Sequence, residues 1–462
     1  MAKDYMILGE NAMYSMDSRE TGLNNNVLII AASGAGKTMS VAEPCLIQRR
    51  NSSQIVTLSK RRLFDKYAPV FEQRGYLVWD LNFVNPQRST AAFDPLYYVH
   101  TLEDITYLAE AIILANPKKE HCNADPYWDE ASVSLLTAEI FLAIMLKKTK
   151  GKRASFTDVL ELHDSLKIEG STTGIATNLD RQFAALEQAD PNCYAISCWK
   201  SFRELAERTA RSVYGTMNVM LDKIFSPQMR KMMAMSRKID FSRMAQEKTI
   251  LFVTSSAVNP TLHRFVNIFY AQAIKSLFEY AENRPDGRLP VPVNMLCDDF
   301  ATGGRILNFP EYISIFREKQ ISVTMLLQSE TQLEGMYGEQ DAATIINNCD
   351  TYVYMGGMDL GTARNMSIRL NAPLEEVLYM PIGQEFVFRR GQRPLVTRRY
   401  DVERDPEYQR ITAEYERRMT REWKGEAGGR DKSDETGPGG SKEESPVQPR
   451  RGGGILQMRK VS

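Results

Sequence analysis

Short apolar runs rich in β-branched residues recur along this chain, and segments with helical periodicity separate them. The first run, residues 26–30, enters a glycine-containing turn, and the segment 37–49 that leaves the turn has the spacing of an α-helix. Further runs predict strands at 54–58, 76–81, 249–254, 293–297, 321–327, 351–355 and 385–389. Because strands that alternate with helices form parallel sheets covered on both faces, the pattern predicts an α/β fold with a mainly parallel sheet.

One stretch, residues 101–242, departs from this alternation because its pattern is helical with almost no strand signal. The helices predicted there are 102–115, 127–147, 155–166, 176–187 and 202–224, and Ser155 is a suitable N-cap residue. We therefore expect an all-helical domain inserted into the α/β domain. The predicted organisation is 1–100 and 243–424 for the two parts of the α/β domain, 101–242 for the inserted all-α domain and 425–462 for a tail.

The composition is that of a globular protein, since 43% of the 462 residues are hydrophobic and 25% are charged. Lys and Arg total 58, as do Asp and Glu, so only local patches of charge can attract nucleic acid. The six cysteines are dispersed, which predicts reduced thiols in a cytosol, and no apolar run approaches the roughly 18 residues of a membrane span. The tail from Gly425 has nine glycines, three prolines and no aromatic residue, so we expect it to be disordered.

The turn after the first strand has the sequence of a phosphate-binding loop. Residues 31–38 read Ala-Ala-Ser-Gly-Ala-Gly-Lys-Thr, with Ala31 where the motif usually begins with glycine. In such a loop consecutive backbone N–H groups cradle the β-phosphate, the lysine reaches the β- and γ-phosphates, and the threonine hydroxyl binds Mg²⁺. The sequence therefore predicts that ATP and Mg²⁺ are bound by Ser33, Gly34, Ala35, Gly36, Lys37 and Thr38.

Two carboxylates end the predicted strand 293–297. Asp298 stands where a second contact with Mg²⁺ is expected, and Asp299 stands where a general base would orient the attacking water. Asp299 is one methylene shorter than the glutamate commonly found at that place, so its geometry decides whether hydrolysis is fast. The alternative interpretation is an acidic turn at a strand end.

Two further polar residues flank the predicted strand 321–327. Gln328 follows the strand and is placed to sense the γ-phosphate or the attacking water, and the alternative is a polar cap on the strand. Arg317 lies in the helical stretch 311–319 that precedes the strand. From there it can reach the nucleotide of a neighbouring subunit as an arginine finger, and the alternative is a surface salt bridge.

In this order the motifs resemble the VirD4/TraG family of type IV secretion coupling proteins, hexameric ATPases that deliver relaxase-bound single-stranded DNA to a conjugation channel. The resemblance covers about residues 26–400. Beyond the phosphate-binding loop it rests on Phe93-Asp94-Pro95-Leu96, Asp125-Pro126-Tyr127-Trp128, Asp298-Asp299-Phe300-Ala301, Leu327-Gln328-Ser329 and Ile345-Ile346-Asn347-Asn348-Cys349. It implies a RecA-like P-loop NTPase domain with an inserted all-helical domain, and it places the family's trans-acting arginine at Arg317.

The sequence departs from the family in two places. Family members usually begin with transmembrane helices, and since this chain shows none we expect a truncated form or one recruited by a membrane partner. The family's acidic loop after the second strand is replaced by Leu58-Ser59-Lys60-Arg61-Arg62. Arg61 and Arg62 are therefore candidate contacts with DNA phosphates, and a solvated loop is the alternative. Looser candidates of the same kind are Lys147, Lys148, Lys150 and Arg153.

The resemblance implies an ATP-driven motor that recruits relaxase-bound single-stranded DNA and pumps it to the type IV secretion channel. The implied partners are single-stranded DNA, the relaxase complex, channel components, a membrane protein and further copies of the chain in a homo-hexamer. The implied location is the cytoplasm, at the inner face of the plasma membrane. Two alternatives stay open: a nucleotide-gated docking receptor for the relaxase complex with little turnover, and a double-stranded DNA translocase of the FtsK/HerA kind.

Overall fold

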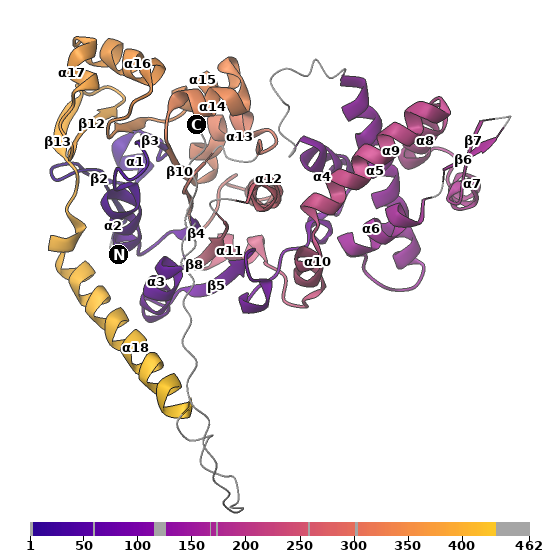
Figure 1. Cartoon of the computed structure of the whole chain (residues 1–462), viewed down its shortest axis with the longest axis horizontal. Helices are drawn as coiled ribbons and strands as arrows, with labels where there is room; N and C mark the ends of the chain where they lie inside the picture. The colour runs from indigo at the N-terminus through magenta and orange to yellow at the C-terminus, as the bar shows by residue number, and fades with distance from the viewer. Residues whose placement is uncertain are drawn as a thin grey trace, which may run out of the picture. The chain divides into compact units, whose positions relative to one another are not determined.

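The computed structural model describes residues 3–58, 61–114, 126–166, 168–171, 174–256, 259–300 and 304–430. The chain divides into two compact units, Met1–Thr412 and Ala413–Ser462. The first unit contains the described strands and almost all of the helices, most of which are labelled in Figure 1. Within the described ranges no helix combines the length and the apolar character that crossing a membrane requires.

In the part of the chain that the structure describes, nine strands form one sheet in the order β13-β12-β11-β3-β10-β9-β4-β8-β5. All neighbours from β11 to β5 are parallel, and β12 and β13 are antiparallel to their neighbours. The strands are β3 (Val27–Ile30), β4 (Ser53–Leu58), β5 (Leu77–Asn82), β8 (Thr249–Thr254), β9 (Val293–Cys297), β10 (Ile321–Leu327), β11 (Thr351–Tyr354), β12 (Gln384–Arg389) and β13 (Leu395–Arg398). The predicted mainly parallel sheet is confirmed.

Every strand that the apolar runs predict is present in the nine-stranded sheet, and one further strand of this sheet was not predicted. The unpredicted strand, β13, lies at the sheet edge and has only one buried residue, Thr397. Its side chains alternate between solvent and the sheet, and Val396 is 52% exposed. A short edge strand of this kind has no continuous apolar run, so the pattern that detects buried parallel strands misses it.

Both faces of the sheet are covered, because the strands alternate their side chains between two apolar cores. On β3, Leu28 and Ile30 belong to one core, and Val27 and Ile29 belong to the other. The first core includes residues of α12 (Pro260–Glu282) and α13 (Phe309–Lys319), and the second includes residues of α2 (Glu43–Gln48) and α3 (Arg62–Gln73). The buried, parallel strands therefore form the centre of a helix–sheet–helix arrangement.

The described parts of the stretch 101–242 are mainly helical, as the periodicity predicts. Its helices are α4 (Leu102–Leu114), α5 (Pro126–Lys148), α6 (Phe156–Ser165), α7 (Asp180–Ala189), α8 (Tyr194–Arg203), α9 (Glu207–Ile224), α10 (Pro227–Ala234) and α11 (Phe241–Gln246). Ser155 caps α6 as predicted: its hydroxyl accepts from the backbone of the first turn, and Asp158 accepts from the Ser155 N–H at 2.9 Å.

Three details of this stretch differ from the prediction. An antiparallel hairpin, β6 (Ile168–Ser171) with β7 (Gly174–Thr177), interrupts the helices, so the segment is not entirely α-helical. The predicted helix 176–187 starts only at Asp180, whose carboxylate accepts a hydrogen bond from the N–H of Thr177 at 2.9 Å. The predicted helix 202–224 is two helices, because the chain turns between α8 and α9 and packs Leu205 against the core.

The remaining strands and α-helices include α18, which begins in the first unit and continues into the second. They are β1 (Tyr5–Ile7), β2 (Met13–Ser15), α1 (Ser18–Thr21), α14 (Glu330–Tyr337), α15 (Glu339–Asn347), α16 (Leu360–Leu370), α17 (Leu374–Leu378) and α18 (Pro406–Arg430). The predicted tail begins at 425, yet residues 425–430 are helical as the end of α18. The rest of the predicted tail, 431–462, lies outside the described residues.

Candidate nucleotide-binding site

The phosphate-binding loop leaves the buried strand β3 and enters a helix, as its sequence predicts. Gly34 and Gly36 have φ angles of 75° and 85°, which side chains rarely allow, so both glycines are required by the backbone itself. A π-helical turn, Thr38–Ala42, follows the loop and continues into α2. The first N–H groups of such a turn lack intrahelical partners and are available to an anion.

Lys37 lies inside this loop and contacts two strand ends. Its Nζ donates to the carbonyl oxygen of Ala31 at 3.0 Å and to that of Leu327 at 3.3 Å. Burial lowers the pKa of Lys37, while the charges of Asp299 and Asp298 act to raise it. These carboxylates are therefore near enough to act on the Lys37 ammonium, although they lie more than 260 residues away in sequence.

The register of the sheet explains why these residues meet. β10 lies between β3 and β9, with Leu327 opposite Ile30 and Met325 opposite Cys297. The three parallel strands therefore end at one edge of the sheet, where Asp298 and Asp299 form the turn after β9. Asp299 has a φ of 51°, a left-handed conformation that is uncommon for a residue with a side chain. Such conformations are often found at functional sites.

Gln328 reaches the same edge from β10, between the loop and the acidic turn. Its side chain is exposed, and its backbone N–H donates to Oε1 of Gln332 at 3.1 Å. Ser329 follows as the N-cap of α14 and accepts from the Gln332 N–H at 3.1 Å. The structure thus brings together the phosphate-binding loop, the two carboxylates and Gln328, all of which the sequence assigned to one site.

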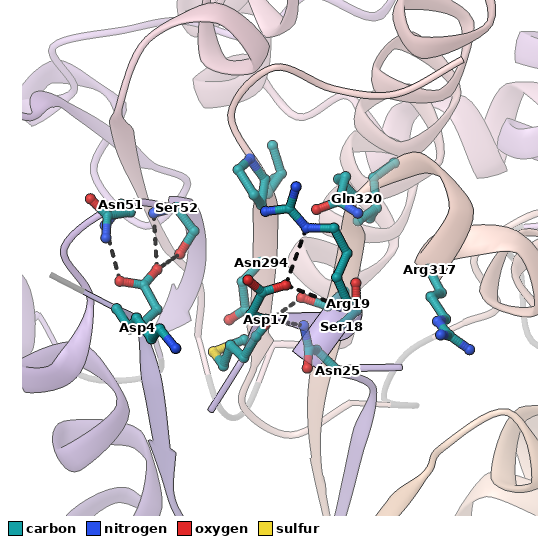
Figure 2. A pocket seen from close by; sticks show the side chains of 16 residues that line it. Asp4, Asp17, Ser18, Arg19, Asn25, Asn51, Ser52, Asn294, Arg317 and Gln320 are labelled. Atoms are coloured by element: carbon teal, nitrogen blue, oxygen red, sulfur yellow. Dashed lines mark hydrogen bonds and ion pairs between the residues drawn. The ribbon is translucent and has the colours of Figure 1, made fainter. Parts of the chain in front are cut away.

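Arg317 lies at the opposite edge of the sheet. It belongs to the last turn of α13, just before β10 begins, whereas Gln328 follows the end of that strand. Seven residues of β-strand separate the two edges by about 20 Å, so Arg317 does not reach the phosphate-binding loop of its own chain. Its exposed side chain lies at a cavity of about 270 Å³ that Arg19, Asn294 and Gln320 also line (Figure 2).

The candidate DNA-contacting residues differ in how many hydrogen bonds and ion pairs they form within the protein. Arg61 donates to both carboxylate oxygens of Asp80, at 3.1 and 2.8 Å, and its guanidinium lies over the ring of Phe64. Arg62 is 61% exposed and lies 3.9 Å from Glu43. Of the looser candidates, Lys147 pairs with Asp158 and Arg153 stacks on Tyr97. Arg62 therefore remains the more available of the adjacent arginines.

The comparison with known families agrees with this arrangement. Residues 2–372 match the model of the family described as Type IV secretory system Conjugative DNA transfer. The chain belongs to this family. It is a coupling protein of the VirD4/TraG type, as the motifs indicated. No curated protein sequence matches the chain.

Several solved structures share the fold. A trigonal form of the conjugative coupling protein TrwBdeltaN70 with sulphate has a TM-score of 0.60 and 16% identity, and covers 82% of this chain and 86% of that one. The plasmid coupling protein TrwB with ADP and Mg²⁺ has a TM-score of 0.60 and 15% identity, with 81% and 85% covered. VirB4 of Thermoanaerobacter pseudethanolicus scores 0.53 at 12% identity, with 87% and 97% covered. The predicted RecA-like fold with a helical insertion is confirmed.

One contact of this coupling protein's loop was not predicted. Arg399, directly after β13, donates to the carbonyl oxygens of Ala35 and Met355. No local motif marks Arg399, because it lies 364 residues from Ala35 and follows the strand that the apolar pattern misses. A further backbone contact, from Ala32 N–H to Gly356 O at 3.0 Å, ties the loop to the chain after β11.

Proposed function

We propose that this coupling protein is an ATP-driven motor that recruits relaxase-bound single-stranded DNA and pumps it to a type IV secretion channel. The observation that carries the proposal is the meeting of the phosphate-binding loop, the Asp298–Asp299 turn and Gln328 at one sheet edge around Lys37. Nucleotide sites of open α/β sheets lie at this carboxyl edge. Membership of the conjugative DNA transfer family supplies the substrate class.

The residues at this edge fit a nucleotide with Mg²⁺. A Cβ at Gly34 would meet no atom within 4 Å, so the loop leaves room for phosphates to approach its backbone. A hydroxyl from Thr38 and a carboxylate from Asp298 are the oxygen ligands that Mg²⁺ prefers. When bound, Mg²⁺ neutralises charge that develops on the phosphates. TrwB has been solved with ADP and Mg²⁺ and with the ATP analogue ADPNP, which supports the same ligands here.

Each residue then has a separate task. Lys37 exchanges its carbonyl partners for phosphate oxygens, which as anions are the stronger acceptors. Asp299 orients the attacking water as general base, and Gln328 contacts that water or the γ-phosphate. Since aspartate holds its carboxylate one methylene further back than glutamate, the expected turnover is slow.

Arg317 takes part only if the motor is a ring. Its position at the opposite edge directs it away from its own nucleotide, and a head-to-tail ring brings that edge to the nucleotide of the next copy. The proposed assembly is a homo-hexamer in which Arg317 stabilises transition-state charge in the neighbouring site. A membrane protein would recruit the ring to the inner face of the plasma membrane, beside the channel.

Steady-state ATP hydrolysis with and without single-stranded DNA tests the motor. We expect DNA to stimulate turnover, and Lys37→Ala and Asp298→Ala to abolish it. Lys200→Ala, an exposed lysine of α8, is the control and should hydrolyse normally. Absence of DNA-stimulated turnover would reject the motor and favour a nucleotide-gated docking receptor for the relaxase complex. Stimulation by duplex rather than single strands would instead favour an FtsK/HerA-like translocase.

A further inference from the structure

Arg399 contacts the phosphate-binding loop from its outer side. Its Nη1 donates to the carbonyl oxygen of Ala35, and its Nη2 donates to that of Met355 at 2.7 Å. Met355 follows β11, the parallel neighbour of β3, and its own N–H donates to Ile30 O at 2.9 Å. One guanidinium therefore joins the tip of the loop to the strand beside it.

The contact matters because of the peptide it engages. Ala35 lies between Gly34 and Gly36, the two residues with left-handed backbone conformations. In a trans peptide the carbonyl and the next N–H point in opposite directions, so a carbonyl that faces Arg399 turns the N–H of Gly36 away from it. That N–H is one of the donors expected to face the phosphates. The planar fork of arginine fixes two acceptors at once, which a lysine cannot do.

Glu385 is fully buried on β12, and its partner in the neighbouring strand, Thr397, is two residues before Arg399. Among the described residues neither of its carboxylate oxygens has a hydrogen-bond partner, and the same is true of Nε of Arg399. Thr397 lies opposite Glu385 on β13, and a Cβ at Gly9 would approach Glu385 Oε1 to 2.5 Å. Thr397 and Gly9 carry no charge, whereas the charge of Arg399 acts on the Glu385 carboxyl.

We propose that Arg399 is a positioning residue for nucleotide binding, and that ionised Glu385 competes with the Ala35 carbonyl for its guanidinium. The proposal rests on the proposed nucleotide site. Held by Arg399, the loop presents its N–H groups to the phosphates. Burial raises the pKa of Glu385 to about 8, while the charge of Arg399 opposes this rise. Below that pH the carboxyl is neutral and leaves Arg399 to the loop, and above it the carboxylate draws Arg399 away.

Calorimetric binding of Mg²⁺–ADPNP to the full chain near pH 7 tests the positioning role. Arg399→Ala removes the guanidinium and its two hydrogen bonds to carbonyl oxygens, so we expect its affinity for Mg²⁺–ADPNP to fall by about tenfold. Arg399→Lys should recover part of this affinity. Arg398→Ala is the matched control, since this neighbouring arginine is exposed, and its affinity should equal that of the unaltered chain. Wild-type affinity in Arg399→Ala would overturn the proposal.

The pH dependence of the same binding tests the role of Glu385 and needs no change at Arg399. Between about pH 7 and about pH 9 we expect the unaltered chain to lose about fivefold in affinity as the carboxyl ionises. Glu385→Gln should match it at the lower pH and hold that affinity at the higher one. Parallel profiles of the two chains would overturn the competition. If the unaltered chain bound no Mg²⁺–ADPNP at all, the proposed nucleotide site itself would be rejected. Normal binding by Arg399→Ala would instead reject only the positioning role of Arg399.

Discussion

Lys66 and Glu43 form an ion pair that is almost completely buried. Lys66 Nζ lies 2.7 Å from Glu43 Oε2, and the two side chains are 2% and 1% exposed. The Tyr67 hydroxyl donates to the same carboxylate oxygen at 2.7 Å. Glu43 begins α2, which follows the phosphate-binding loop, and Lys66 and Tyr67 belong to α3. The pair therefore fixes the helix that carries the loop against its neighbour.

Removing one member of this pair should cost much more than removing an exposed charge nearby. Glu43→Ala leaves the Lys66 ammonium buried without its counter-charge, which is expected to lower the free energy of unfolding by about 3–5 kcal/mol. Arg62→Ala, whose side chain is 61% exposed and 3.9 Å from Glu43, should change it by less than about 0.5 kcal/mol. Urea unfolding of both variants measures the difference, and equal midpoints would contradict the structural role of the pair.

The adjacent arginines 61 and 62 should separate stability from DNA binding. Arg61→Ala leaves Asp80, a side chain that is 1% exposed, without its bidentate partner, so we expect a loss of about 2 kcal/mol in unfolding free energy. Arg62→Ala should leave the free energy of unfolding unchanged. It should weaken the binding of single-stranded DNA and reduce the salt dependence of that binding by about one phosphate contact. Binding titrations at several salt concentrations measure this. An unchanged salt slope in Arg62→Ala would assign Arg62 to solvent alone.

The short side chain of Asp299 should limit the rate of ATP hydrolysis. Asp299→Glu extends the carboxylate by one methylene and is expected to raise ATP turnover several-fold, whereas Asp299→Asn should abolish it. The φ of 51° suits aspartate better than glutamate, so Asp299→Glu should also be slightly less stable. Turnover and thermal unfolding measured on the same samples separate the two effects. If Asp299→Asn hydrolysed ATP normally, Asp299 would not be the base.

Arg317 should act on a neighbouring copy, which mixing of two inactive variants can reveal. Arg317→Ala keeps its own phosphate-binding loop, and Lys37→Ala keeps its arginine. In a ring mixed at random in equal parts, about one interface in four would join an intact loop to an intact arginine. ATP turnover should therefore reappear on mixing, although each variant alone is inactive. A mixture as inactive as its components would argue against a trans-acting Arg317.

The buried His163–Glu139 pair in the helical stretch should make stability depend on pH. His163 Nδ1 lies 3.0 Å from both Glu139 oxygens. Burial acts to lower the pKa of His163, but the charge and hydrogen bond of Glu139, with smaller contributions from the charges of Asp164 and Asp222, raise the pKa above its ordinary 6.5. A raised histidine pKa stabilises the folded chain below pH 6.5, and this contribution is lost as the pH rises through the folded-state value.

The Glu139→Gln variant tests this sign directly. Without the Glu139 carboxylate, burial is the largest influence on the His163 pKa and only the smaller effects of the Asp164 and Asp222 charges oppose it. The neutral form of His163 is then favoured, and stability should instead fall as the pH drops below its ordinary pKa. Unfolding free energies measured from about pH 5.5 to about pH 8.5 give the two slopes. The prediction is that the slopes have opposite signs, and equal slopes would show that Glu139 does not control the titration.

The sequence by itself determined the parts of this protein that rest on local patterns. Buried parallel strands such as 249–254 and 321–327 are continuous apolar runs, so their positions follow from hydropathy alone. The loop at 31–38 was recognised from its glycines, its lysine and the strand before it. Its assembly with Asp298 and Gln328 could also be anticipated, because the carboxyl ends of parallel strands share one edge of a sheet.

Only the tertiary structure decided what depends on contacts between distant segments. It engages Arg61 with Asp80, places Arg317 at the edge opposite the loop, and brings Arg399 onto Ala35. The same charged residue can be solvated, paired or catalytic, and nothing in its immediate neighbours distinguishes these states. The strand order distinguishes these states, because it determines which side chains lie at the same edge of the sheet and which buried charges form ion pairs. That is why hydropathy located the strands of the site, whereas the roles of its arginines required the fold.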